Sequence, residues 1–120
     1  MRKISCIFAL FCVFAVCFVP QSGFSYVKKD IARVRVMDKI AGKTQVVKLP
    51  VGQNVQIDGL TMVVRDCEQS DPYDAENYFV FIEIYKKNTN RIFSGWMNHN
   101  EPGQNPLQDD TYDVWLEKCE

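Results

Sequence analysis

The side chains that could carry chemistry fall into small groups, and the first is centred on the single histidine, His99. His99 could act with Ser94 as nucleophile and Asp113 as orienting acid, because catalytic triads are defined by geometry and not by chain order. The spacing of the three does not support that arrangement, and the zinc-protease, nucleophile-elbow and phosphate-loop motifs are absent. We therefore expect no enzyme and no cofactor, and we expect His99 to be a solvated loop residue.

Carboxylates form two further groups, and such groups can supply the six to eight oxygen ligands that Ca²⁺ takes. Their spacing fits no EF-hand loop, which needs a central glycine and a final glutamate. Aspartate is also frequent in turns, because its side chain bonds the local backbone. We therefore assign no metal ligand. The groups are Asp71, Asp74 and Glu76, and then Glu101, Asp109, Asp110 and Asp113.

Aromatic side chains form the last group, and Trp96 and Trp115 flank a loop with two prolines, residues 98–110. With His99 and Tyr112 they form a candidate binding surface for a sugar or an extended peptide, since binding residues concentrate on loops held by a rigid scaffold. Tryptophan also buries a large area in a small domain. Core packing is therefore our expectation for each indole, and a binding platform is the alternative.

The first 25 residues have the layout of a secretory signal peptide. Two cations, Arg2 and Lys3, precede an uncharged apolar segment over residues 4–19, and Gly23 and Ser25 supply the small side chains that a cleavage site needs. We expect cleavage at this point, which leaves residues 26–120 as a single domain and places the protein in the periplasm.

Two alternatives for the leader stay open. The 16 residues of the apolar segment fall short of the ~20 that span a bilayer, which argues against a retained anchor. Lipid attachment at Cys17 is the other alternative, although the bulky residues 14–16 are a poor lead-in. After cleavage we expect no stable membrane span, and at most a peripheral association with the envelope.

Cysteine usage fits export. Removal of the leader leaves only Cys67 and Cys119, and an oxidising compartment would join an even pair. A disulfide that closes a loop of this length stabilises the folded state by about 4 kcal/mol in the chain-entropy model. A redox or metal thiol pair is disfavoured, because no second cysteine or histidine lies near either residue in the sequence.

The charge of the chain is balanced overall but divided along its length. With 14 basic and 15 acidic residues the formal net charge is −1, which argues against a nucleic-acid partner. Residues 26–65 carry eight basic and three acidic side chains, whereas residues 66–120 carry four basic and 12 acidic ones. We expect the two halves to interleave as neighbouring strands and pair their charges, and an acidic binding face is the alternative.

Short runs of alternating apolar and polar residues, separated by turns, predict an all-β fold. We expect a small antiparallel sandwich or a partly open barrel of six to seven short strands, because no helical run reaches ten residues and 120 residues are too few for a Rossmann sheet or a TIM barrel. Residues 78–85 form the expected central strand. The other strands are expected at 31–37, 44–49, around 55–57, 60–66, 91–97 and 111–116.

Glycine and proline mark the breaks between these strands. Asp58-Gly59 is a strong two-residue hairpin signal, and Pro50 should end its strand because it has no backbone N–H. Gly95 within a strand indicates a bulge or a close approach. Residues 68–77 and 98–110 are expected to be loops, the first with one helical turn as an option.

Several of these segments together resemble the DUF2155 family of exported bacterial proteins. The resemblance covers nearly all of residues 26–120 and rests on residues 32–53, on Cys67 with residues 72–77, on Phe-Ser-Gly-Trp-Met at 93–97 and on Tyr-Asp-Val-Trp-Leu-Glu-Lys-Cys at 112–119. It implies a Gram-negative envelope location and no known activity. The loop between the last two segments departs from the family pattern, so a function carried by that loop's side chains does not transfer.

Two functional hypotheses follow from these observations. The first is a non-enzymatic binding or accessory module of the cell envelope, which presents the 98–110 loop and a sheet edge to a protein partner. The second is a domain that binds a cell-wall glycan or a metal ion. Exposure of the two tryptophans separates them, since a sugar ligand needs an accessible aromatic ring.

Overall fold

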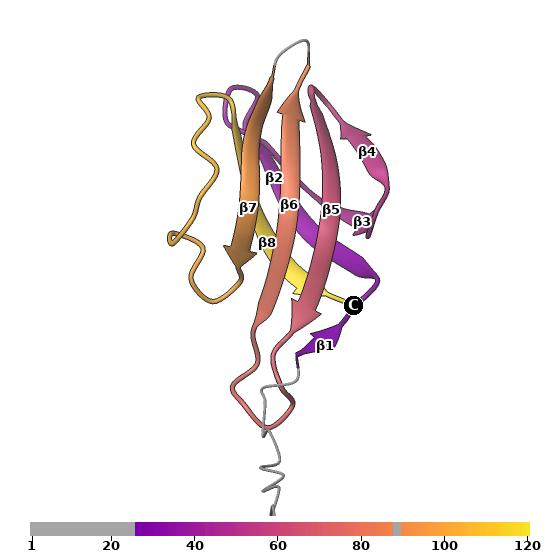
Figure 1. The fold of residues 1–120 in the computed structure, drawn as a ribbon. Coiled ribbons are helices and arrows are strands. Elements are labelled where there is room, and N and C mark those ends of the chain that lie inside the picture. The colour runs from indigo at the N-terminus through magenta and orange to yellow at the C-terminus, as the bar shows by residue number, and fades with distance from the viewer. Residues whose placement is uncertain (1–25, 88–89) are drawn as a thin grey trace, which may run out of the picture.

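The computed structural model describes residues 26–87 and 90–120, which form eight strands and no helix. The strands make two antiparallel sheets packed face to face (Figure 1). The predicted all-β sandwich is confirmed, and its sheets do not close into a barrel. The eighth strand is the two-residue β1, which the sequence pattern did not predict. The strands are β1 (Val27–Lys28), β2 (Ile31–Asp38), β3 (Lys43–Pro50), β4 (Asn54–Ile57), β5 (Leu60–Gln69), β6 (Tyr78–Lys86), β7 (Arg91–Asn98) and β8 (Tyr112–Cys119).

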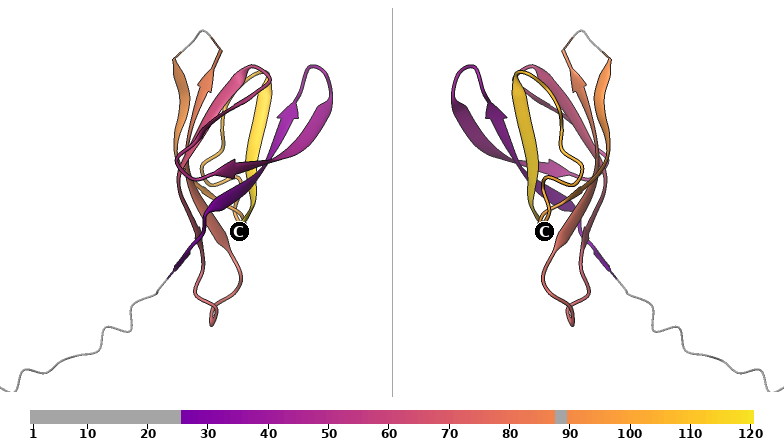
Figure 2. Two further views of the ribbon diagram at one scale, coloured as in Figure 1. Left: turned by 90° about the vertical axis from the view of Figure 1, so that its right-hand side faces the viewer. Right: turned by 90° about the vertical axis from the view of Figure 1, so that its left-hand side faces the viewer.

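The larger sheet has the order β1–β5–β6–β7, and β4 also pairs with β5. The run of residues 78–85 is therefore a central strand, as predicted, with β5 and β7 on its two sides. The smaller sheet has the order β3–β2–β8. Figure 2 shows the sandwich from the side, with the β2–β3 hairpin leaning away from the larger sheet.

The core lies between the sheets and follows from the period-two alternation of the strands. In β2 the buried side chains are Ala32, Val34 and Val36, each with at most 1% of its surface exposed. In β6 the even-numbered residues 78–84 are buried and the odd-numbered ones are half-buried on the outer face. Each fully buried aliphatic side chain contributes about 1.5–3 kcal/mol, so this interdigitated layer is the main source of stability.

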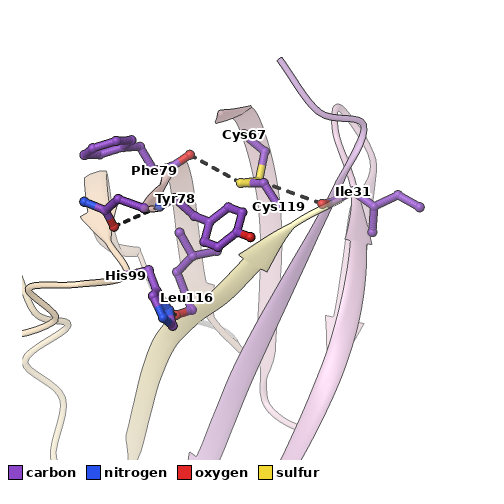
Figure 3. The surroundings of a disulfide bond; sticks show 8 residues. Ile31, Cys67, Tyr78, Phe79, His99, Leu116 and Cys119 are labelled. Carbon is purple, nitrogen blue, oxygen red and sulfur yellow. Dashed lines mark hydrogen bonds between the residues drawn. A yellow bond between two sulfur atoms is a disulfide. The ribbon is translucent and has the colours of Figure 1, made fainter. Parts of the chain in front are cut away.

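A disulfide joins the two sheets through Cys67 of β5 and Cys119 of β8, as predicted. Their Cα atoms are 5.7 Å apart, and both side chains are fully buried. Figure 3 shows the sulfur atoms between two backbone carbonyls: Cys67 Sγ lies 3.9 Å from the oxygen of Ile31, and Cys119 Sγ lies 3.5 Å from the oxygen of Phe79. The bond therefore fixes the end of β8 against the larger sheet.

Residues 99–111, the closing loop, connect β7 to β8 and lie beside both strands (Figures 1 and 2). Most of the closing loop is exposed, but the Leu107 side chain is only 5% exposed and belongs to the core. Asn105 Nδ2 donates a hydrogen bond of 3.0 Å to the carbonyl of Trp96. The expected loop is thus confirmed, and it covers one side of the sandwich.

The unequal charge of the two halves of the chain is resolved by strand pairing, as expected. Basic β2 lies beside acidic β8, so Arg35 pairs with Glu117, and Arg33 with Glu120 at 3.4 Å. Other pairs across the two halves are Lys28–Asp66, Lys28–Glu68, Lys39–Asp113, Lys48–Glu120 and Arg65–Glu83.

The predicted turns are confirmed, with small corrections to the bounds of one loop and to the position of a strand irregularity. The hairpin between β4 and β5 turns at Asp58-Gly59, where Asp58 has φ +51°. Strand β5 continues to Gln69, so the loop expected from residue 68 starts at Ser70 and contains a tight turn in place of a helical one. Gly95 marks a close approach, because an added Cβ would lie 2.8 Å from Asn105 Nδ2. The irregularity of β7 against β6 lies elsewhere, opposite the end of β6.

The expected signal peptide, its cleavage site and Cys17 lie outside the described residues. Among residues 26–87 and 90–120, no helix is long and apolar enough to cross a membrane.

Candidate functional site

The structure places the four predicted surface residues on different parts of the sandwich. Trp96 lies on the outer face of the larger sheet and is 44% exposed. Trp115 is half-buried on the outer face of the smaller sheet, opposite Arg35. His99 is an exposed residue of the closing loop. The four side chains therefore do not form one surface. The expectation that both indoles pack in the core is wrong, because Trp96 is exposed and Trp115 lies half-buried on an outer face.

Tyr112 is a core residue, which corrects its assignment to an exposed surface. Its side chain is 8% exposed, and its hydroxyl accepts a hydrogen bond of 3.2 Å from the backbone N–H of Gly59. A Cβ on Gly59 would lie 2.9 Å from this hydroxyl, so the glycine allows the contact. The physical reason is parity, because Tyr112 shares the inward face of β8 with Val114 and Leu116.

His99 has a defined position although it is exposed. Its Nδ1 lies 3.0 Å from the carbonyl oxygen of Leu116, which requires Nδ1 to carry the proton and donate it. Its ring also meets the Tyr78 ring edge to face at 5.8 Å between centroids. His99 forms no hydrogen bond with Ser94 or Asp113 in the structure. The interactions that it does form hold the start of the closing loop against β8.

The carboxylate groups serve turns and ion pairs. Asp109 is a largely buried example, with 10% of its side chain exposed beside Lys86 Nζ at 3.2 Å. Burial raises the pKa of Asp109, but the backbone N–H groups of Thr111 and Tyr112 and the ammonium of Lys86 outweigh it, so that the pKa is lowered overall. Within the described part of the chain, no three His, Cys, Asp or Glu side chains gather closely enough to hold a metal ion.

Sequence reasoning missed an aromatic surface on the outer side of the larger sheet. Four side chains define this aromatic face, and they come from β6, β7 and the residue before β1: Tyr26, Phe79, Phe81 and Trp96. The Tyr26 and Phe79 rings lie 5.3 Å apart, and the Phe81 and Trp96 rings meet nearly edge to face at 5.5 Å. Figure 3 shows Phe79 directed away from the disulfide and from the core.

The alternation within β6 was the signal for this surface. Phe79 and Phe81 have the same parity as Glu83, and a carboxylate does not face the core of a small sandwich. The strongly apolar sequence of residues 78–85 obscured that parity. Trp96 lies opposite Phe81 in the register, so its position follows from that of β6.

The aromatic face has a charged border. Toward the far end of β6, Glu83 accepts from Arg65 Nε at 2.9 Å and from the hydroxyl of Tyr85 at 2.9 Å. These two bonds lower the pKa of Glu83. Near β1, Lys28 pairs with both Asp66 and Glu68. The outer face is thus apolar in one half and carries satisfied ion pairs beside it.

A pocket of about 410 Å³ opens at the β1 end of the aromatic face. Tyr26 and Phe79 supply its apolar wall, and Asp74, Asn77 and Asn100 supply polar groups. The loop of residues 70–77 and the closing loop are tied together here, since Asn100 N donates to Asn77 Oδ1 at 3.0 Å and Asn100 Nδ2 to the carbonyl of Glu76 at 3.0 Å. These two bonds therefore fix the polar wall of the pocket.

The loop of residues 70–77 presents one further aromatic side chain at its tip. Tyr73 is 97% exposed, while Ser70 at the base is buried and donates to the carbonyl of Ala75 at 3.0 Å. Tyr78, directly after the loop, donates its hydroxyl proton to Glu76, and this bond raises the pKa of Tyr78 to about 12. The sequence analysis did not single out this exposed tip.

Comparison with known proteins identifies a family but no characterised relative. Searches of curated proteins and of solved structures return no match. A family model described as "Uncharacterized protein conserved in bacteria (DUF2155)" matches residues 32–119, which include strands β3–β8, all of β2 except Ile31, and both disulfide cysteines. The predicted resemblance is confirmed, and the chain belongs to the DUF2155 family.

Proposed function

We propose that this protein is a non-enzymatic, exported module of the bacterial envelope that binds another protein through its aromatic face. The supporting observation is that Tyr26, Phe79, Phe81 and Trp96 lie together on the solvent side of a sheet whose other face already supplies the core. Contiguous exposed apolar side chains of this kind mark interaction surfaces in soluble proteins.

The composition of the aromatic face favours a protein partner. Trp, Tyr and Phe are enriched at the centres of protein interfaces, and a polar border excludes water from such centres. Here Lys28, Asp66 and Glu68 form one border and the Glu83 cluster forms the other. Phe79, Phe81 and Trp96 lie on the adjacent paired strands β6 and β7, so ordering them on binding would cost little conformational entropy.

Site-specific photo-crosslinking in intact cells tests the binding face. A photoreactive residue at Trp96 should give a discrete protein adduct, which mass spectrometry identifies, and the same residue at Lys118 of the smaller sheet should not. With the captured protein purified, the double variant Phe81→Ser/Trp96→Ser should bind at least tenfold more weakly than wild type at unchanged melting temperature. Adducts only from Lys118, or unchanged affinity of the double variant, would contradict the proposal.

Export is tested separately. Cell fractionation should place the protein in the periplasm, and N-terminal sequencing of the mature product should begin at Tyr26. A product that keeps Met1 and stays in the cytoplasm with both Cys67 and Cys119 titratable would refute export, whatever the crosslinking result.

A cell-wall glycan is the second candidate ligand, and the pocket beside Tyr26 supports it. Its pairing of an aromatic wall with Asp74, Asn77 and Asn100 is the combination that sugar rings and hydroxyls require. Titration with soluble cell-wall oligosaccharides, followed by NMR, should then shift the Asn77 and Asn100 side-chain amides, and Tyr26→Ala should abolish the shifts. Shifts confined to the Trp96 indole, or no shifts, would count against this candidate.

A further inference from the structure

Strand β3 is an open edge of the smaller sheet. It pairs with β2 along its whole length, from Asp38↔Lys43 to Ile31↔Pro50. On its other side the described part of the chain supplies no strand, since the sheet order is β3–β2–β8. The edge strand β7 of the larger sheet differs, because the closing loop lies against it and Asn105 Nδ2 donates a hydrogen bond to the Trp96 carbonyl.

Backbone parity identifies the groups at the free edge. Ile31 exchanges both of its backbone hydrogen bonds with Glu120, at 2.9 and 2.8 Å, so it bonds toward β8 and not toward its β3 partner, Pro50. Antiparallel pairs alternate between bonded and non-bonded. Pro50 and every second residue before it, namely Lys48, Val46 and Thr44, therefore direct their backbone groups away from β2.

Solvent reaches both faces of the first half of β3. Residues 43–46 are all exposed, with Val46 47% exposed, and the hairpin tip residue Ile40 is 79% exposed. Figure 2 shows this end of the hairpin standing clear of the larger sheet. One contact reaches this part of β3 from the β4–β5 turn, since Gln45 Nε2 donates to Asp58 Oδ2 at 3.3 Å. A strand added beside β3 would shield the apolar Val46 side chain.

The charges along β3 indicate which kind of strand could pair with its free edge. Lys43 forms no ion pair with any residue of the described structure, and Lys48 shares the carboxylate of Glu120 with Arg33, at 3.3 and 3.4 Å. Two cations against one carboxylate leave a positive edge. A second copy of β3 would place two more lysines beside Lys43 and Lys48, and like charges on neighbouring strands destabilise their pairing. Opposite charges stabilise it, so an acidic strand is favoured.

We propose that β3 binds an extended acidic segment of another protein by strand addition. The segment pairs with the backbone of Thr44, Val46 and Lys48, and its carboxylates lie beside Lys43 and Lys48. Strand addition takes affinity from main-chain hydrogen bonds and specificity from alternate side chains. The proposal uses a different sheet from the aromatic face, so either can fail without the other.

A peptide probe tests this inference. The probe is a blocked eight-residue peptide of alternating Glu and Val, and the control is its counterpart of alternating Lys and Val. The Glu peptide should bind at least tenfold more tightly, with an affinity that falls as salt is raised. Hydrogen exchange followed by NMR should show the amides of Thr44, Val46 and Lys48 exchanging rapidly in the free protein and protected at least tenfold in the complex.

Two variants separate pairing from folding. Val46→Pro removes an edge N–H without removing a bond to β2 and should abolish binding. Should that variant unfold, Lys43→Glu/Lys48→Glu keeps the backbone and should reverse the preference toward the Lys peptide. The matched control Lys118→Glu, an exposed cation of β8, should leave the affinity within twofold.

Three results would overturn the proposal. One is equal binding of the two peptides, and another is protection of amides other than those of the β3 edge. The third is concentration-dependent self-association that protects Thr44, Val46 and Lys48 without peptide, since it would assign the edge to a second copy of the chain.

Discussion

The closing loop and residues 40–46 of the β2–β3 hairpin are both largely exposed, yet they are attached to the body in different ways. The closing loop has no regular structure, but Leu107 enters the core, Asn105 binds the Trp96 carbonyl, and Asp109 pairs with Lys86. Strand β2 of the hairpin belongs to the core and also pairs with β8, but residues 40–46 are exposed, and β3 pairs there with β2 alone; the tip residue Ile40 is 79% exposed. The closing loop is therefore held by side-chain anchors, whereas residues 40–46 are held mainly by backbone pairing with β2.

This difference has a functional consequence. A loop held at several points covers the edge of β7 and keeps one wall of the pocket beside Tyr26 in place. Strand β3 leaves one edge unpaired, so the backbone groups on that edge stay available to a partner. The edge of β7 is thus covered, whereas the edge of β3 is accessible.

Removal of the disulfide should have the largest effect, because it releases β8 and with it the end of the closing loop. For a closed loop of this length, about 4 kcal/mol of stability should be lost in Cys67→Ser/Cys119→Ser. For a domain of this size that corresponds to a fall in melting temperature of roughly 15–30 °C. Circular dichroism during heating measures it. Wild-type protein with two titratable thiols and the melting temperature of the double variant would contradict the prediction.

Truncation of Leu107 should have the next largest effect on the free energy of unfolding. Together with a matched variant in the hairpin, it compares the two regions directly. Leu107→Ala removes a side chain that is 95% buried and should cost about 2–5 kcal/mol. The matched variant Ile40→Ala at the exposed hairpin tip should change stability by less than about 0.5 kcal/mol. Urea denaturation gives both values. Equal costs for the two variants would show that the loop is not anchored through Leu107.

Loss of the Asp109 charge should have a smaller effect with a defined pH dependence. Asp109→Asn weakens the bonds to Lys86 and to the N–H groups of Thr111 and Tyr112, and should cost about 1–2 kcal/mol at pH 7. Because the pKa of Asp109 is lowered in the folded state, this contribution is complete above the ordinary carboxyl pKa of about 4. It is lost as pH falls below that value, so wild type and variant should converge there. A difference that is the same at pH 7 and pH 3 would exclude this account.

Much of the fold could be predicted from the sequence because it depends on local alternation. The strands, the Asp58-Gly59 turn, the pairing of Cys67 with Cys119 and the proximity of basic β2 to acidic β8 all follow from period, parity and charge. Such features are fixed by residues close in sequence or by pairing rules that do not require knowledge of the full topology.

The candidate site was harder to predict, because it depends on which face of each strand is turned outward. The alternation of Tyr112, Val114 and Leu116 was a local signal that all three are buried, and it was overlooked in favour of the neighbouring tryptophans. The anchoring of Leu107 had a weaker signal, one aliphatic side chain in a polar loop. The contact of Tyr26 with Phe79 joins residues 53 positions apart and needed the fold itself.

The smallest effect is expected at the base of the hairpin, where Arg35 of β2 pairs with Glu117 of β8. Their side chains are 40% and 28% exposed, and half-exposed pairs couple by only about 0.2–1 kcal/mol, because water screens the charges and ordering two long side chains costs entropy. A double-mutant cycle with Arg35→Gln and Glu117→Gln should give a coupling in that range that vanishes in 1 M NaCl. Lys43→Gln, at a cation without an ion pair in the described structure, should show no coupling with Glu117→Gln. A salt-independent coupling above about 2 kcal/mol would mean that the β2–β8 seam holds the hairpin as firmly as Leu107 holds the closing loop, and the contrast between the two regions would fail.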